Sequence, residues 1–310
     1  MNNRQKPTRW WAELLLLGLL YGAYSGGRLL ARGDVQLAVD HGLAVLRAED
    51  LLGIAFERPL NRLFSHHAPL GVPADFVYAS LHYLVTPAVL VWLYRRRPAH
   101  YRTARTWLVS STLLGLVGFA LMPTCPPRLL DAAHGFTDTM AQYSAYGWWG
   151  AEASAPRGFG GLTNQYAAMP SLHVGWALWC GILMWRHGRH PLLRAFGIAY
   201  PAATVLVVMG TANHYFLDAV AGAAVMGLGY AVARGLSART DARADAGDDA
   251  DDDAPATDLG AASPAAGPAA PPAGFRGTTP IVSGGWDTSA RELLPAQRPA
   301  PEDDSAAAAR

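Results

Sequence analysis

The sequence has few charged residues, a single lysine and only two cysteines. Charged residues make up 16% of the 310 residues and the formal net charge is +1, so the composition gives no indication of a nucleic-acid partner. Because Lys6 is the single lysine, any other contact with a phosphate must come from arginine, histidine, a hydroxyl group or the backbone. Cys125 and Cys180 are too few for a disulfide framework and do not have the spacing of a metal-binding motif.

Long apolar stretches, by contrast, are abundant, and hydrophobic residues make up 51% of the chain. A helix that spans a bilayer needs about 20 mostly apolar residues. Six stretches meet or approach this length, at roughly 10–31, 74–94, 105–122, 171–186, 193–211 and 214–233. They predict an all-α fold, a multi-pass transmembrane helical bundle of about six spans. A soluble helical bundle is the alternative, although soluble cores rarely contain so many runs of this kind.

Arginines set the predicted orientation of these spans. They cluster before the first stretch and in the segments after the second, fourth and sixth, which share one side if the chain crosses six times. Basic segments of this kind are typical of the cytoplasmic side, so we expect a cell-membrane protein with both termini in the cytoplasm. Residues 1–31 also resemble a secretory signal peptide, but they are long and lack a clear small-residue cleavage site, which favours a retained first helix.

Two segments outside the spans differ in character. Residues 44–64 combine roughly helical apolar spacing with charges of both signs, which predicts an amphipathic helix lying in the membrane interface. After about residue 237 the chain is rich in Asp, Ala, Pro and Gly and poor in large apolar residues, a composition that favours disorder. The predicted organisation is therefore a membrane-embedded domain over residues 1–236 and a disordered acidic tail over residues 237–310.

Polar residues gather at the predicted outer ends of three spans. The fourth begins with "PSLH", the sixth with "NHYFLD", and the third ends in "PTCPPRLL". Because the fourth and sixth spans run inward and the third runs outward, one level of the membrane receives Ser171, His173, His214, Asp218 and Arg128. The sequence thus predicts one polar site on the extracytoplasmic side.

These residue types favour phosphoryl transfer. Helix N-termini attract anions, Ser171 can cap a helix and contact a phosphate oxygen, and arginine binds phosphate in a bidentate manner. We expect the N-termini of the fourth and sixth spans, with Arg128, to cradle one phosphate. His214 and Asp218 are four residues apart and share a helix face, so the carboxylate can orient a nucleophilic imidazole that forms a phosphohistidine. His173 would then act as general acid and general base.

A metal site is a rival for the same residues. Two histidines and one aspartate could hold zinc. The nearby Arg128 favours an anion over a cation, so we expect neither a metal nor another cofactor.

The segments "MPSLHVGWA" and "NHYFLDAVAG" resemble the second and third signature motifs of the type 2 phosphatidic acid phosphatase superfamily, the lipid phosphate phosphatases. The form "PSLH" is most similar to the inositolphosphotransferase branch, which includes fungal inositol phosphorylceramide synthases. The resemblance covers roughly residues 40–235 and implies a bundle of about six helices. It also implies that His214 accepts the phosphate, Asp218 orients His214, His173 is the general acid and Ser171 contacts the phosphate.

The sequence departs from this family pattern at two places. The first motif, Lys-x6-Arg-Pro, is absent as written, and Arg128 stands as the counterpart of its arginine. Val208 occupies the position, six residues before His214, where the family usually has arginine. The phosphate therefore has fewer cationic partners, which fits a less charged phosphodiester substrate or compensation by Arg157.

Together these features predict an integral membrane enzyme that cleaves or transfers a phosphate or phospho-headgroup on a lipid phosphate or phosphodiester. The acceptor would be water, as in a phosphatase, or an alcohol such as inositol, as in a phosphotransferase; both use the same nucleophile and base. A non-catalytic membrane scaffold or transporter with the same bundle is the alternative. The presence of His173, His214 and Asp218 favours the enzyme.

Overall fold

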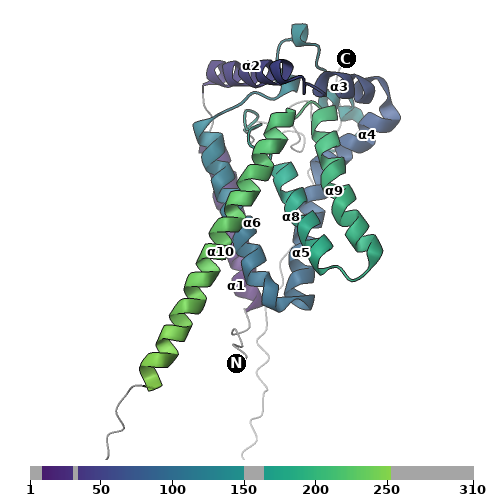
Figure 1. Cartoon of the computed structure of the whole chain (residues 1–310). Helices are drawn as coiled ribbons and strands as arrows, with labels where there is room; N and C mark the ends of the chain where they lie inside the picture. Colours follow the sequence, from purple (N-terminus) through teal and green to yellow (C-terminus); the bar gives the residue numbers. More distant parts are fainter. Residues whose placement is uncertain (1–8, 31–33, 150–163, 253–310) are drawn as a thin grey trace, which may run out of the picture. The chain divides into compact units, whose positions relative to one another are not determined.

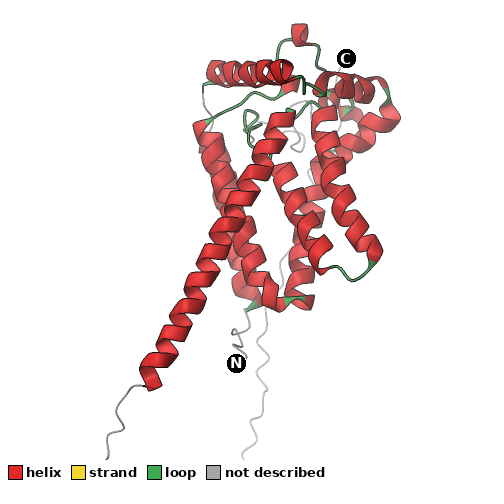
Figure 2. Cartoon of the chain, in the orientation of Figure 1, coloured by secondary structure: helices red, strands yellow, loops and turns green. Residues whose placement is uncertain are grey.

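Every regular element in the described residues, which are 9–30, 34–149 and 164–252 of this computed structural model, is a helix (Figures 1 and 2). The prediction of an all-α bundle is confirmed. The α-helices are α1 (Trp10–Leu30), α2 (Val35–Leu52), α3 (Glu57–His66), α4 (Ala68–Phe76), α5 (His82–Arg96), α6 (Pro98–Leu121), α7 (Thr139–Gln142), α8 (Leu172–His187), α9 (Pro191–Gly210) and α10 (Phe216–Asp252). A π-helical turn, η1 (Val77–Leu81), joins α4 to α5, and the 3-10 turns are η2 (Pro127–Leu129), η3 (Ala132–His134) and η4 (Ser144–Tyr146).

Each of the six apolar stretches lies in a helix, the second being the continuous run of α4, η1 and α5. Four helical runs are long and apolar enough to cross a membrane, namely Ala68–Arg96, Pro98–Leu121, Pro191–Gly210 and Phe216–Thr240. These fit a membrane protein. By contrast, α8 has 16 residues, and it packs against α5, α6, α9 and α10. Its neighbours, rather than lipid, cover most of α8.

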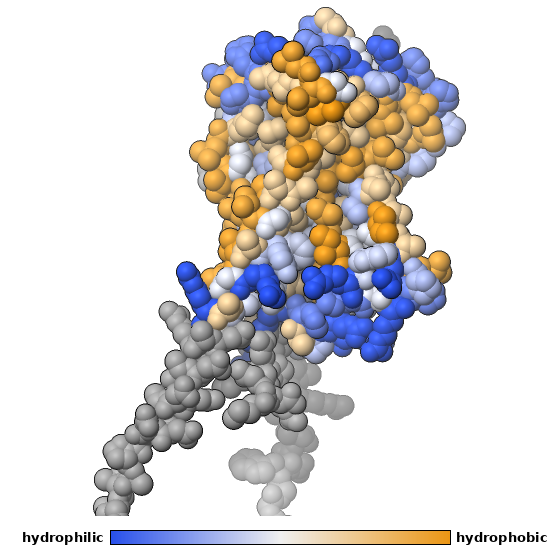
Figure 3. Space-filling model, viewed as in Figure 1, coloured by the Kyte–Doolittle hydropathy of each residue, from blue (hydrophilic) through white to orange (hydrophobic). Residues whose placement is uncertain are grey.

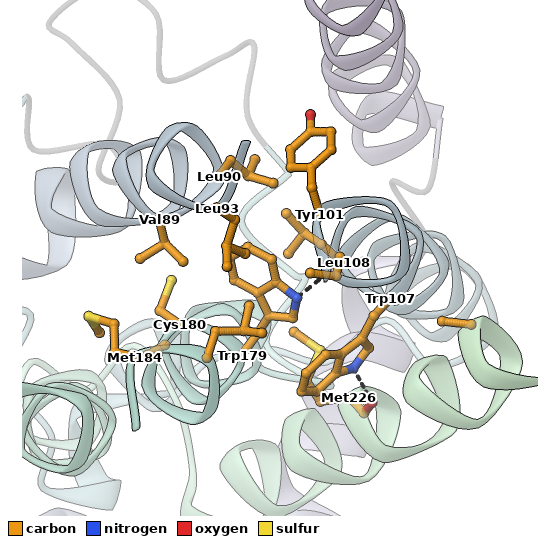
Figure 4. Packing of buried hydrophobic residues seen from close by; sticks show 14 of the residues in the cluster. Val89, Leu90, Leu93, Tyr101, Trp107, Leu108, Trp179, Cys180, Met184 and Met226 are labelled. Carbon is orange, nitrogen blue, oxygen red and sulfur yellow. Dashed lines mark hydrogen bonds between the residues drawn. The ribbon is translucent and has the colours of Figure 1, made fainter. Parts of the chain in front are cut away.

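Two tryptophans tie α6, α8 and α10 together in the largest apolar core (Figure 4). The indole N–H of Trp179 on α8 donates to the Ala104 carbonyl of α6 at 3.0 Å. The indole N–H of Trp107 on α6 donates to the Met226 carbonyl of α10 at 2.7 Å. Both rings are buried, where an unpaired N–H group would be costly. The core therefore fixes the three helices that carry or border the predicted site.

The α2, α3 and α4 helices lie at the opposite end of the bundle from the arginine-rich turns (Figure 1). Gly53 ends α2 with a left-handed φ of 69°, which lets the chain turn sharply into α3. The predicted amphipathic segment over residues 44–64 falls in two helices, α2 and α3, and its place in the membrane interface stays a prediction. Glu49, Glu57 and Asn61 on these helices are fully buried, since they find hydrogen-bond partners on the interior side.

The described basic segments share the other end of the bundle (Figure 3). The turn between α5 and α6 lies against the end of α8, because the guanidinium of Arg97 donates to the His187 carbonyl at 3.0 Å. Glu13, the acid inside the first apolar stretch, is bound by Tyr101 and Arg105 of α6. The first apolar helix thus accommodates its charge by pairing it.

The α10 helix continues to Asp252, past residue 236 where the sequence predicted that the tail would begin. The first proline after α10 begins is Pro255, so no proline interrupts the helical backbone before Asp252. The boundary between the predicted domain and tail stays a prediction. The predicted disorder of residues 253–310 lies outside the described residues.

Candidate active site

Loops from distant parts of the chain are hydrogen-bonded together where the predicted site lies. Thr124, after α6, forms an isolated bridge with Ala167, just before α8. The amide of Arg128 donates to the carbonyl of Ala212, in the connection from α9 to α10, at 2.9 Å. The loop after α6 is therefore fastened both to the start of α8 and to the start of α10.

His214 is held through one ring nitrogen. Its Nδ1 lies 2.9 Å from the Ala168 carbonyl and 3.3 Å from Oδ2 of Asp218. Both partners are acceptors when Asp218 is ionised, so Nδ1 carries the proton and Nε2 keeps its lone pair. The same Asp218 oxygen accepts from the Tyr215 amide at 2.9 Å. This carboxylate is fully buried, and it fixes both the ring and the backbone that carries it.

His173 lies beside His214, with 5.7 Å between the ring centroids. It stands in the first turn of α8 and is partly exposed. Tyr78 of η1 stacks on its ring at 4.5 Å, with 26° between the planes. The His82 ring meets it edge to face, also at 4.5 Å. A π-helical turn often marks a functional site, and here it supplies Tyr78 just before α5 supplies His82.

Ser171 forms the N-cap of α8. Its Oγ accepts from the Val174 amide at 3.5 Å, and its own amide donates to the Asp218 carbonyl at 2.9 Å. The residue is fully buried. The start of α8 is therefore packed directly against the first turn of α10, which explains how the two histidines come together.

Arg128 is buried and bound by protein groups on three sides. Its Nε donates to Asn213 at 3.0 Å, one Nη to Asp138 at 2.8 Å and the other to Gln165 at 3.4 Å. The Arg128 side chain is 4% exposed, so the ion pair with Asp138 is largely shielded from water. The positive charge next to His214 is thus matched by an internal negative charge.

Two further carboxyl groups lie on the N-terminus of α10. Oε1 of Glu57 accepts from the Phe216 amide at 2.6 Å, and Oε1 of Glu49 accepts from the Leu217 amide at 2.7 Å. Burial raises the pKa of Glu49 to about 8, and the negative charges of Glu57 and Asp218 add to this. Burial also raises the pKa of Glu57. The expectation that α10 would present unoccupied N–H groups to a phosphate is therefore wrong.

All five side chains predicted from the sequence lie in this region. Val208 takes no part as a side chain, since it packs in an apolar cluster, but its carbonyl accepts from the His214 amide at 3.1 Å. Arg157 lies outside the described residues. The additional residues of the site are Glu49, Glu57, Tyr78, His82, Asp138, Asn213 and Gln165.

Some of these residues had a signal in the sequence. Tyr78 and His82 are four residues apart inside an apolar run, a spacing that places two polar rings on one helix face. We find no comparable signal for Glu49 and Glu57, because acids are ordinary in an amphipathic segment. Among the described residues, no group of three or more His, Cys, Asp or Glu side chains is arranged to hold a metal ion.

A family model described as the PAP2 superfamily matches residues 43–232, more than half of the chain. The chain belongs to the PAP2 superfamily. No curated protein and no solved structure matches it. The type 2 phosphatidic acid phosphatase resemblance is therefore confirmed at the level of the superfamily, whereas the inositolphosphotransferase branch is not. Membership of the PAP2 superfamily indicates an enzyme of the phosphatase or phosphotransferase type, and the four long apolar helices fit a membrane protein.

Proposed function

We propose that this PAP2 enzyme transfers a phospho-headgroup from a lipid phosphodiester to an alcohol such as inositol, through a phosphohistidine on His214. The observation that carries the proposal is the pair of adjacent rings of His173 and His214, 5.7 Å apart between centroids. Asp218 and Ala168 hold Nδ1 of His214, so Nε2 is the available nucleophile. His173 stands where it can reach the leaving oxygen.

The reaction has two balanced steps. In the first, Nε2 of His214 attacks phosphorus, the bond from phosphorus to the leaving alcohol breaks, and His173 gives that oxygen a proton. In the second, His173 removes a proton from the acceptor hydroxyl, whose oxygen attacks phosphorus and releases His214. Asp218 stabilises the positive charge that develops on His214. Arg128 and the N-terminus of α8 stabilise the phosphoryl oxygens.

The charges of the site support a phosphodiester rather than a monoester. Arg128 shares its charge with Asp138 at 2.8 Å, and Val208 stands where relatives usually carry a second arginine. Among the described residues of the site, a monoester dianion would meet one guanidinium, which is already paired. A diester carries one negative charge and needs less cationic compensation.

An apolar groove supports a lipid substrate. A cavity of about 170 Å³ reaches His82, the residue in contact with His173, from the apolar surface of the bundle. Its walls include Leu17 of α1, Leu113 of α6 and Trp176 of α8. Hydrocarbon chains in this groove would bring a headgroup to the two histidines.

We also propose that the site faces the extracytoplasmic side of the cell membrane and that both termini are cytoplasmic. The described arginine-rich segments lie at the end of the bundle away from His214, and such segments favour the cytoplasm. Labelling of single cysteines introduced at exposed positions of α3 and of the α8–α9 turn would test this. Equal access of an impermeant reagent to both positions in sealed cells contradicts the topology.

The function is tested with the purified full chain and phospholipids labelled in the phosphodiester, with and without inositol. We expect the label to move from the lipid to a water-soluble phosphodiester of the headgroup and inositol through an acid-labile phosphoenzyme, and both to be lost in His214→Asn by roughly 10³-fold or more. His66→Asn, an exposed histidine of α3, is the matched control. Release of the phospho-headgroup alone, with water as the acceptor, would identify a hydrolase. Absence of any phosphoenzyme would favour the scaffold alternative, and inhibition by a chelator that zinc reverses would favour the metal alternative.

A second experiment tests the role of His173 separately. A nitrophenyl phosphodiester has a leaving group that needs no proton, so His173→Asn should still form the phosphoenzyme from it while failing on the natural type of lipid. Equal losses on both substrates would remove His173 as the general acid.

A further inference from the structure

A second cavity lies between α6, α8 and α10, toward the arginine-rich end of the bundle. Its volume is about 510 Å³, within the range of roughly 300–1,000 Å³ that is usual for small-molecule sites. Its basic rim lies away from the proposed active site, because α10 rises by roughly 24 Å between Asp218 and Arg234 at about 1.5 Å per residue. The proposed reaction uses none of its residues.

The cavity has an apolar interior and a basic rim. Its interior is formed by aliphatic and aromatic side chains that include Leu178, Ile182, Met226 and Tyr230. Its rim carries Arg186 and Arg234, which are both exposed, together with His100 and His187. The two imidazoles are in contact, with ring centroids 4.3 Å apart.

The described side chains around the rim include no acid that pairs with it. The stretches 92–105, 178–194 and 223–240, which form this end of α5, α6, α8 and α10, contain no aspartate or glutamate. Within the described part of the chain, no ion pair links Arg186 or Arg234 to a carboxylate. Glu13, which reaches this end from α1, is held by Arg105 and Tyr101. The positive charge at the rim is therefore available to an anion.

We propose that this cavity binds an anionic phospholipid from the membrane leaflet at the basic end. The phosphate would lie against Arg186 and Arg234, and one acyl chain would occupy the apolar interior. Basic pockets between transmembrane helices bind anionic headgroups in this way. The apolar walls favour a lipid over a free phosphate, because a small anion would leave the interior empty. The bound lipid would join three helices whose other ends carry or border the active site.

The test uses the purified full chain, equilibrated with vesicles of phosphatidylcholine and phosphatidylglycerol and then examined by native mass spectrometry. Arg186→Gln/Arg234→Gln should weaken retention of phosphatidylglycerol roughly 30-fold, because each basic side chain near the membrane surface contributes a factor of about five. The matched control is Arg95→Gln/Arg96→Gln, two exposed arginines of the same end that do not line the cavity.

A second pair of variants tests the interior without altering charge. Gly227 lines the cavity, and a Cβ at this position would meet no atom within 4 Å, so Gly227→Phe can fill the space without displacing backbone. Gly235 on the same helix is equally unobstructed and lies outside the cavity, so Gly235→Phe is its control. Gly227→Phe should reduce phosphatidylglycerol retention, and Gly235→Phe should not.

Three outcomes would overturn the proposal: equal retention in the arginine pair and its control, equal retention in the two phenylalanine variants, or full displacement of the lipid by excess inorganic phosphate. Retention of phosphatidylcholine at the level of phosphatidylglycerol would likewise exclude an anionic headgroup site. If one variant fails to fold, the other pair decides the question. None of these measurements depends on catalysis, so the lipid site and the proposed reaction can fail separately.

Discussion

The two histidines of the active site come from helices whose N-termini are built in different ways. The start of α8 has a neutral cap, in which Ser171 accepts from an amide of the first turn at 3.5 Å. The start of α10 is covered by acids, since the amides of Phe216 and Leu217 donate to Glu57 at 2.6 Å and to Glu49 at 2.7 Å. A helix N-terminus carries partial positive charge. On α10 the first amides already donate to carboxyl groups of the protein, whereas the side-chain acceptor at the start of α8 is a hydroxyl group.

The two N-termini therefore have different proposed roles: that of α10 anchors a histidine, and that of α8 binds the phosphate. His214 lies just before α10, and the acidic cap binds this N-terminus to the α2–α3 region, so the proposed nucleophile lies on an anchored backbone. The N-terminus of α8 carries His173 and is packed against α10 through the amide of Ser171. We infer that carboxyl groups keep a phosphate from settling on α10 and direct it toward α8 and Arg128.

The largest expected effect comes from removing part of the acidic cap. Glu57→Ala leaves the partly buried Phe216 amide without its acceptor, which should lower the free energy of unfolding by about 1–3 kcal/mol. Activity should fall as well, because His214 stands two residues before that amide. Glu57→Gln keeps a carbonyl acceptor and should stay close to wild type. Thermal unfolding in detergent and turnover of a labelled lipid measure the two effects. Equal thermal stability and turnover of the Ala and Gln variants would show that this hydrogen bond does not anchor the start of α10.

Much of the fold could be predicted from the sequence. The six apolar runs and the arginine-rich segments between them gave the helices, their order and the shared basic end. Two features escaped this approach. The segment 44–64 was predicted to lie in the interface, but its buried face depends on partners from α10 that no local pattern reveals. Helix α10 extends to Asp252, past the apolar run, and no proline interrupts it before that residue.

Residues of the candidate site could be predicted where they belong to short sequence motifs. His173, His214, Asp218 and Ser171 belong to two short segments at helix starts, and Arg128 follows from the topology. The arginine's ion pair with Asp138 could not be predicted, because the two residues meet through an irregular loop. The acidic cap is likewise a tertiary contact, because Glu49 and Leu217 are 168 residues apart in the sequence.

The pH dependence of stability should show whether the acidic cap of α10 titrates as a buried group. Burial and neighbouring negative charges raise the pKa of Glu49 from 4.5 to about 8, so the folded protein binds this proton more tightly than the unfolded chain does. The resulting stabilisation is complete below about pH 4.5 and is lost as the pH rises through about 8. Glu49→Gln stays neutral and keeps the acceptor for Leu217. The melting temperature of wild type minus that of Glu49→Gln should therefore decrease across this interval. A constant difference would mean that Glu49 titrates normally.

The smallest expected effect is at the neutral cap of α8, where two substitutions distinguish capping from phosphate contact. Ser171→Ala removes a helix cap and should cost roughly 0.5–2 kcal/mol, whereas Ser171→Gly should cost only a few tenths of a kcal/mol. Both variants lack the hydroxyl group. If Ser171 also donates to a phosphate oxygen, the two variants should lose the same amount of kcat/KM despite unequal melting temperatures. If activity instead follows the melting temperature, the hydroxyl serves only the helix, and recognition of the phosphate must rest on Arg128, His173 and the backbone amides of α8.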